Sequence, residues 1–123
     1  MKRVLVADDE PVTLRLHQMV LRQTGVEAAL FEDGDSVLLE MDSVAPDLAV
    51  LDYQLPGKNG LELVAALRAH PKLAGIPIIV VTGYRELELK EALLEAGANE
   101  VIIKPFSPRM LRSRIESLLM LPA

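Results

Sequence analysis

Residues 48–60 read LAVLDYQLPGKNG, a pattern from which the architecture of the whole chain can be worked out. The first four residues are uniformly apolar, Asp52 follows them, and Asn59 with Gly60 opens a helical pattern. A short aliphatic run that does not alternate with polar residues is typical of a strand buried on both faces of a parallel sheet. The stretch therefore predicts a buried strand that ends in a carboxylate and leads into a helix.

The same unit recurs along the chain. Buried-strand patterns cover residues 4–7, 76–81 and 101–103, and a weaker one at residues 28–31 indicates a more exposed strand. Apolar residues at helical spacing fill each gap, and the helices are marked by Pro11, Gly25, an Asp33 or Asp35 cap, Gly97, and Ser107 followed by Pro108. Five strands alternating with five helices predict an α/β fold, (βα)5, with a parallel sheet and helices on both faces. We expect one domain over residues 1–123.

Composition narrows the function. The net charge is −5, which disfavours direct nucleic-acid binding by this chain, and the absence of cysteine excludes disulfides and thiolate metal sites. No stretch approaches the ~20 consecutive apolar residues of a membrane helix. The apolar run near the N-terminus is too short for a signal peptide and stops at Asp8. These features predict a cytoplasmic protein without membrane association.

Polar residues stand where four of the predicted strands end: Asp8 and Asp9, Asp52, Thr82 and Gly83, and Lys104 with Pro105. In a doubly wound sheet, ligands bind beyond the carboxyl ends of the strands, so these groups are expected to converge. Each alone has an ordinary explanation, because an Asp or Thr often caps a helix and a Lys is usually solvated. The conjunction of all four is what predicts a site.

The residue types at these positions indicate metal-assisted phosphoryl chemistry. Neighbouring carboxylates repel one another unless a cation compensates, and Mg²⁺ suits one or two carboxylates with water and a phosphate; Mn²⁺ can take its place. Asp52 could then attack phosphorus and form an aspartyl phosphate, with Lys104 and Thr82 holding its oxygens and Gly83 allowing close backbone approach. A glycine-rich phosphate loop is absent from the turn after residues 4–7.

These motifs, in this order and over essentially the whole chain, closely resemble the receiver domains of two-component response regulators, including chemotaxis regulators. The resemblance implies a flavodoxin-like sheet with strand order 2-1-3-4-5. It implies that Asp52 accepts phosphate from a histidine kinase or a histidine phosphotransfer protein, and that Thr82 and Lys104 contact the phosphoryl group. It implies a Mg²⁺ site formed by Asp9, Asp52 and the Gln54 backbone carbonyl, with Asp8 assisting through water, and a cis peptide bond before Pro105.

The resemblance also places expectations on regulation. Phosphorylation would switch the surface of the fourth helix, fifth strand and fifth helix toward a downstream protein or a fused output domain. Val101 stands where the family usually has an aromatic switch residue, so coupling to that surface should differ here. Gln54 and Tyr84 occupy the positions that tune dephosphorylation in the family, and the bulky Tyr84 predicts a long-lived aspartyl phosphate.

Two other functions compete with the phosphorylation switch. One is a degenerate receiver that binds a partner without phosphorylation, which Val101 supports and the intact set of polar residues opposes. The other is a phosphohydrolase resembling the haloacid dehalogenases, which would need an Asp two residues after Asp52, where Gln54 stands. We therefore expect self-phosphorylation and autodephosphorylation at Asp52 rather than enzymatic turnover. His17 and His70 are expected to be surface residues.

Overall fold

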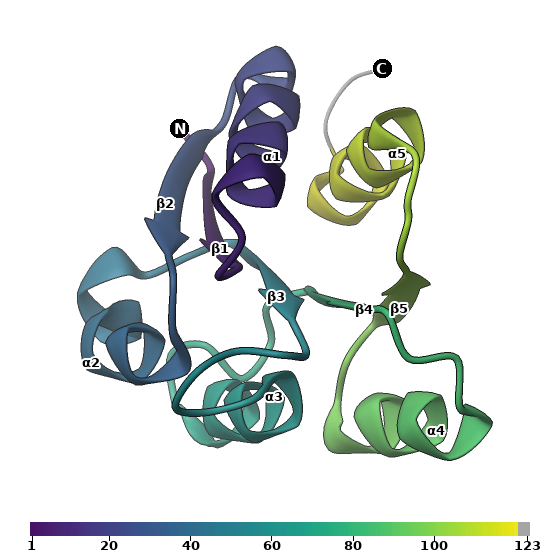
Figure 1. Ribbon diagram of the computed structural model, residues 1–123. Coiled ribbons are helices and arrows are strands. Elements are labelled where there is room, and N and C mark those ends of the chain that lie inside the picture. Colours follow the sequence, from purple (N-terminus) through teal and green to yellow (C-terminus); the bar gives the residue numbers. More distant parts are fainter. Residues whose placement is uncertain (121–123) are drawn as a thin grey trace.

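Strands and helices alternate strictly in the computed structural model, which describes residues 1–120 (Figure 1). The last three residues of the predicted domain lie outside the described residues. The strands are β1 (Arg3–Ala7), β2 (Glu27–Phe31), β3 (Leu48–Asp52), β4 (Ile78–Thr82) and β5 (Glu100–Ile103). The helices are α1 (Pro11–Thr24), α2 (Gly34–Val44), α3 (Gly60–Ala69), α4 (Leu87–Ala96) and α5 (Pro108–Leu119).

The five strands form one parallel sheet in the order β2-β1-β3-β4-β5. This is the flavodoxin-like order that the resemblance predicted. Because the order reverses between β1 and β3, the connections that follow these two strands leave toward opposite sides. The carboxyl ends of β1 and β3 therefore border the switch point, where ligands bind in open α/β sheets.

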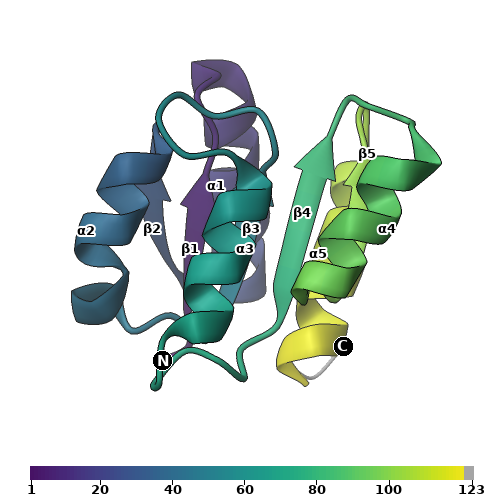
Figure 2. The same cartoon turned by 90° about the horizontal axis from the view of Figure 1, so that it is seen from below.

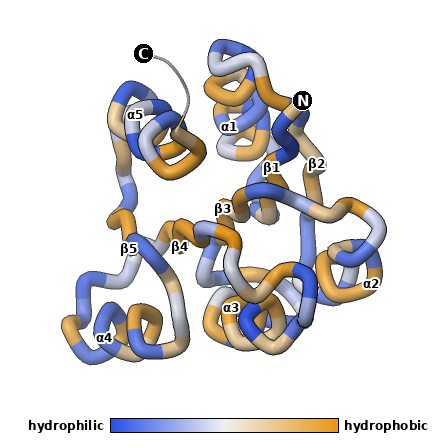
Figure 3. The backbone as a smooth tube through the Cα atoms, turned by 180° about the vertical axis from the view of Figure 1, so that it is seen from behind, coloured by the Kyte–Doolittle hydropathy of each residue, from blue (hydrophilic) through white to orange (hydrophobic). Residues whose placement is uncertain are grey.

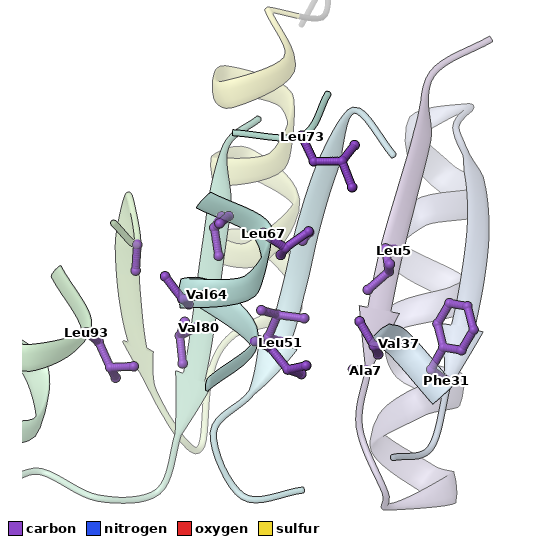
Figure 4. Close-up of a cluster of buried hydrophobic side chains, with 14 residues drawn as sticks. Leu5, Ala7, Phe31, Val37, Leu51, Val64, Leu67, Leu73, Val80 and Leu93 are labelled. Carbon is purple, nitrogen blue, oxygen red and sulfur yellow. The ribbon is translucent and has the colours of Figure 1, made fainter. Parts of the chain in front are cut away.

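Helices cover both faces of the sheet: α1 and α5 lie on one side, and α2, α3 and α4 lie on the other (Figures 1 and 2). Successive residues of a strand point to opposite faces, so the apolar strands in Figure 3 serve two cores at once. Leu5, Leu51 and Val80 face α2–α4 (Figure 4), whereas Val6, Val50 and Val81 face α1 and α5. Burial on both faces is why these strand sequences do not alternate.

The start of α3 fixes the segment that follows β3. Asn59 and Glu62 form a reciprocal capping box, in which the Asn59 side chain accepts from the Glu62 amide and the Glu62 side chain accepts from the Asn59 amide. A Cβ at Gly60 would lie 2.7 Å from the Tyr53 Cα atom, so only glycine allows this contact. The close approach packs α3 against the backbone directly after Asp52.

Several strand boundaries differ from the prediction by one or two residues. The fourth strand begins at Ile78 rather than residue 76, because Pro77 has no amide hydrogen and the Ile76 amide donates to Leu73 in a turn. Asp52 and Thr82 are the last residues of their strands rather than the first residues after them. No helix within residues 1–120 has the length and apolar character needed to cross a membrane.

Candidate functional site

Asp52 is held rigidly at the carboxyl end of β3. Asp52 is 4% exposed, its Oδ1 accepts from the Gln54 amide at 3.0 Å, and its Oδ2 accepts from Lys104 Nζ at 2.7 Å. On the neighbouring strand, the Val81 carbonyl accepts from the Tyr53 amide. Both carboxylate oxygens of Asp52 therefore have a hydrogen-bond donor, and the donor to Oδ2 is a cation.

Asp8 and Asp9 bring two more carboxylates to the same place. One carboxylate oxygen from each of Asp8, Asp9 and Asp52 lies within 4.8 Å of the others, and Asp9 is exposed to solvent. Asp8 is fully buried; its Oδ1 accepts from the Glu10 amide at 2.9 Å, whereas its Oδ2 has no hydrogen-bond partner among the described residues. A buried, unsatisfied carboxylate oxygen beside two further carboxylates fits a hard divalent cation such as Mg²⁺.

Lys104 supplies the positive charge of the site. It directly follows β5, its amide donates to the Thr82 carbonyl at 2.8 Å, and its Nζ lies 3.8 Å from Asp8 Oδ2 as well as 2.7 Å from Asp52 Oδ2. The peptide bond between Lys104 and Pro105 is cis. One ammonium group therefore faces both buried carboxylates.

The carboxylates respond differently to this environment. Burial raises the pKa of Asp52 above its ordinary 3.8 and outweighs the Lys104 ammonium and the Gln54 amide. Burial also acts on Asp8, but the His17 ring, the Glu10 amide and the charge of Lys104 together hold the pKa of Asp8 below 3.8. The pKa of Lys104 lies above 10.5, because its contacts with Asp52 and Asp8 outweigh the effect of burial. Lys104 is therefore a full cation at neutral pH.

Thr82 and the residues after it border the site from β4. Thr82 is 1% exposed, and its Oγ1 accepts from the Tyr84 amide at 3.0 Å. A Cβ at Gly83 would meet only the Gln54 side chain, at 3.9 Å, so the structure gives no steric reason for glycine there. The expectation that Gly83 serves close backbone approach thus gains no support from packing.

Gln54 and Tyr84, which follow Asp52 and Thr82 by two residues, contact each other. Gln54 Nε2 donates to the Tyr84 hydroxyl at 3.1 Å, and the Tyr84 ring packs edge-on against Tyr53 with centroids 6.0 Å apart. Val101 on β5 is half-buried and packs against the α2–α4 core. Gln54 and Tyr84, the two side chains expected to tune dephosphorylation, therefore form a hydrogen bond between the segment after β3 and the segment after β4.

The prediction that His17 is a surface residue is wrong. The residue is buried, at 2% exposure, its Nε2 lies 3.7 Å from Asp8 Oδ2, and its ring stacks on Phe106. Leu14, Val20 and Leu21 flank His17 at helical spacing on the apolar side of α1, a signal that could have placed it inside. His70 is half-buried and pairs with Asp42 at 2.9 Å, far from the site at the other end of α3.

Comparisons with known proteins agree with this geometry. The sequence profile of the response regulator receiver domain matches residues 4–116. The chain is 36% identical over 116 residues to the DNA-binding response regulator MtrA of Mycolicibacterium smegmatis, covering 94% of this chain and 50% of that protein. It thus spans about half the length of such curated relatives.

Solved structures give the same result. A response regulator structure from Chloroflexus aurantiacus superposes with a TM-score of 0.90 at 32% identity, covering 97% of this chain and 98% of that one. The receiver domain of a sensor histidine kinase from Pseudomonas aeruginosa PAO1, with magnesium coordinated in its active-site cleft, has a TM-score of 0.87 at 25% identity and similar coverage, 97% and 98%. By sequence, strand order and site geometry, this chain belongs to the response regulator receiver domain family of two-component signal transduction.

Proposed function

We propose that this domain accepts a phosphoryl group on Asp52 from a phosphohistidine donor, on a histidine kinase or a histidine phosphotransfer protein. The observation that carries the proposal is the 2.7 Å contact between Lys104 and Asp52 beside the carboxylates of Asp8 and Asp9. An Asp52 oxygen forms the new bond to phosphorus, and the bond from phosphorus to the donor nitrogen breaks with its electron pair leaving on nitrogen. The domain is a phosphoacceptor and does not turn over a separate substrate as an enzyme does.

Each residue of the candidate site has a specific role in this proposal. Asp8, Asp9, Asp52 and the Gln54 carbonyl would hold Mg²⁺, which when bound neutralises charge on the transferring phosphoryl group. Lys104 and the Thr82 hydroxyl would hold two phosphoryl oxygens. These two residues directly precede the segments that lead into α5 and α4, so a shift of either is passed to the α4-β5-α5 surface. The partner at that surface would be a downstream protein or a fused output domain. We also propose that residues 1–123 form one domain and that the protein is located in the cytoplasm.

The test is intact-mass spectrometry after incubation with acetyl phosphate, with Mg²⁺ or with a chelator. We expect one phosphoryl adduct that needs Mg²⁺, that borohydride reduction locates at residue 52, and that is missing in Asp52→Asn. A folded, Mg²⁺-supplied protein that forms no adduct would contradict the proposal. That result would favour the phosphorylation-independent binding module, for which Val101 is the specific observation.

The contact between Gln54 and Tyr84 leads to a prediction on the lifetime of the adduct. The Tyr84 side chain is held by Gln54 and by Tyr53, the two residues that directly follow the acceptor, so we expect it to obstruct the water that attacks the aspartyl phosphate. Tyr84→Ala is expected to shorten the lifetime by about tenfold, because it opens the aspartyl phosphate to water. Tyr84→Phe keeps the ring and should stay within about threefold of the wild type.

The lifetime is measured by following the decay of the adduct mass after removal of the phosphodonor. Leu87→Ala is a matched control, because Leu87 is also an exposed apolar residue at the start of α4. Decay in Tyr84→Ala at the wild-type rate would show that Tyr84 does not shield the aspartyl phosphate.

A further inference from the structure

His17 joins the candidate site to the β5–α5 connection. It projects from α1 between Asp8 and Phe106, and its ring is stacked on the Phe106 ring at a centroid distance of 5.5 Å and an angle of 28°. Its 2% exposure leaves almost no access to bulk water. A polar ring in this position is expected to have a polar partner inside the protein, because an unpaired buried donor is costly.

Asp8 offers that partner. Its Oδ2 is the one buried side-chain oxygen or nitrogen without a hydrogen bond in the part of the chain that the structure describes. Two donors face this oxygen just beyond hydrogen-bond distance, His17 Nε2 at 3.7 Å and Lys104 Nζ at 3.8 Å. A small rotation of the Asp8 carboxylate or of the imidazole would close one of these contacts.

The two donors differ in how they respond to a metal cation. Lys104 is an ammonium ion, which a divalent cation beside Asp8 repels, and its Nζ is already shared with Asp52. A neutral imidazole donates one N–H without carrying a net charge, so it can satisfy the carboxylate while the cation is bound. His17 is therefore the donor that suits the metal-bound site.

We propose that His17 is a positioning residue of the metal site, whose Nε2–H group holds the Asp8 carboxylate in the orientation that binds Mg²⁺. This inference rests on the proposed function, because it takes Asp8, Asp9 and Asp52 as the metal ligands. It assigns His17 no direct contact with the metal: the three carboxylates meet within 4.8 Å of one another without a His17 atom in the set. Donors to metal-binding carboxylates typically contribute 10- to 100-fold to metal affinity.

A purely structural role is the alternative explanation. Stacking on Phe106 fills space between α1 and the β5–α5 connection, and any apolar side chain of similar size could do the same. The two roles make different predictions for His17→Leu and His17→Gln. Leucine keeps the apolar volume and removes the donor, whereas glutamine places an amide N–H at about the reach of Nε2.

The experiment is isothermal titration of the metal-free protein with MgCl₂ at neutral pH, without any phosphodonor. We expect His17→Leu to bind Mg²⁺ about tenfold more weakly than the wild type and His17→Gln to stay within about threefold of it. Val20→Ala is the matched control, because Val20 is equally buried on α1, packs in the α1–α5 core and has no polar group. It should lose stability and keep the wild-type Mg²⁺ affinity.

A second measurement examines the ring itself. Long-range ¹H–¹⁵N spectra of the Mg²⁺-bound protein should show His17 with its hydrogen on Nε2. Wild-type Mg²⁺ affinity in His17→Leu, or a hydrogen carried on Nδ1 alone, would overturn the role of His17 and leave the phosphoacceptor function intact. Failure of the wild-type protein to bind Mg²⁺ would instead overturn both.

Discussion

Lys104→Met is expected to lower the free energy of unfolding of the metal-free protein by about 2 kcal/mol, because it removes the cation shared by two buried carboxylates. The Lys104 side chain is 24% exposed and its partners are nearly inaccessible, so solvent screens the pair only partly. The same change should slow phosphoryl transfer to Asp52 on the order of 100-fold, the usual effect of removing one preorganised charge from the transferring group.

The loss of Lys104 should have the opposite effect on metal binding. Its ammonium group competes with a divalent cation for Asp52 and Asp8, so its removal is expected to strengthen Mg²⁺ binding. Because a bound ligand stabilises the native state by RT ln(1 + [L]/Kd), the same high Mg²⁺ concentration should raise the unfolding midpoint more in the tighter-binding Lys104→Met than in the wild type. Phosphorylation rates are therefore compared at saturating Mg²⁺, where any difference in affinity drops out.

The dependence of stability on pH in the alkaline range gives an independent check of the contribution of Lys104. The pKa of Lys104 is raised above 10.5 in the folded state, so its contribution to stability is fully present below 10.5 and is lost as the pH rises through the folded-state pKa. The stability difference between the wild type and Lys104→Met should therefore shrink only above pH 10.5. Urea unfolding across this range, with and without Mg²⁺, measures the effect.

Lys58→Met is the control for the loss of a lysine near the site. Lys58 lies in the β3–α3 connection and forms an exposed pair with Glu62 at 3.8 Å, a contact worth about 0.5 kcal/mol. Equal phosphorylation rates in Lys104→Met and Lys58→Met would show that the ammonium group of Lys104 takes no part in phosphoryl transfer.

The fold could be predicted from the sequence because both faces of this sheet are buried. The side chains of residues 48–51 pack alternately into the α2–α4 core and the α1–α5 core, so every position must be apolar. Such an apolar run can be recognised in the sequence alone. The boundary at Ile78 was missed for a local reason: Ile76 and Pro77 are apolar, but neither has an amide free to pair in the sheet. Hydropathy reports burial, and hydrogen bonding decides where a strand begins.

Part of the site could be predicted from the sequence, because the carboxyl ends of parallel strands meet at one edge of the sheet. Asp8, Asp52 and Lys104 stand directly at strand ends, so topology alone brings them together. His17 was missed because its environment depends on Phe106, which lies far along the chain and reaches α1 only through the packing of α5. The helical spacing of Leu14, Val20 and Leu21 around His17 indicates that it is buried, but nothing in the local sequence indicates the contact with Phe106.

Arg68 was missed for the same reason, and it organises the opposite edge of the sheet. From the last turn of α3 its guanidinium group donates to the carbonyl of Gly97 through two nitrogens, to the carbonyls of Ala74 and Ile76, and to the Asn99 side chain. The Asn99 side chain in turn accepts from the Ile78 amide at 2.7 Å. One cation thus ties α3 to the segments that enter β4 and β5.

Arg68→Met is expected to lower the free energy of unfolding by about 3 kcal/mol, because it leaves three carbonyls and an amide oxygen without their charged donor. In a domain of this size, such a loss corresponds to a fall of about 10 °C in the unfolding midpoint. Thermal unfolding in the absence of Mg²⁺ measures it. Arg68→Lys keeps the charge but not the planar fork, so it should recover only part of the loss.

The position of Arg68 makes the prediction separable from function. It lies where β4 and β5 begin, whereas Asp52 and Lys104 lie where strands end, so the remaining folded Arg68→Met protein should bind Mg²⁺ with wild-type affinity at low temperature. Arg85→Met, at an exposed arginine before α4, should change stability by less than about 0.5 kcal/mol. Equal stability of Arg68→Met and Arg85→Met would mean that water replaces the guanidinium donors at no cost. The sheet would then be held at that edge by its apolar cores alone.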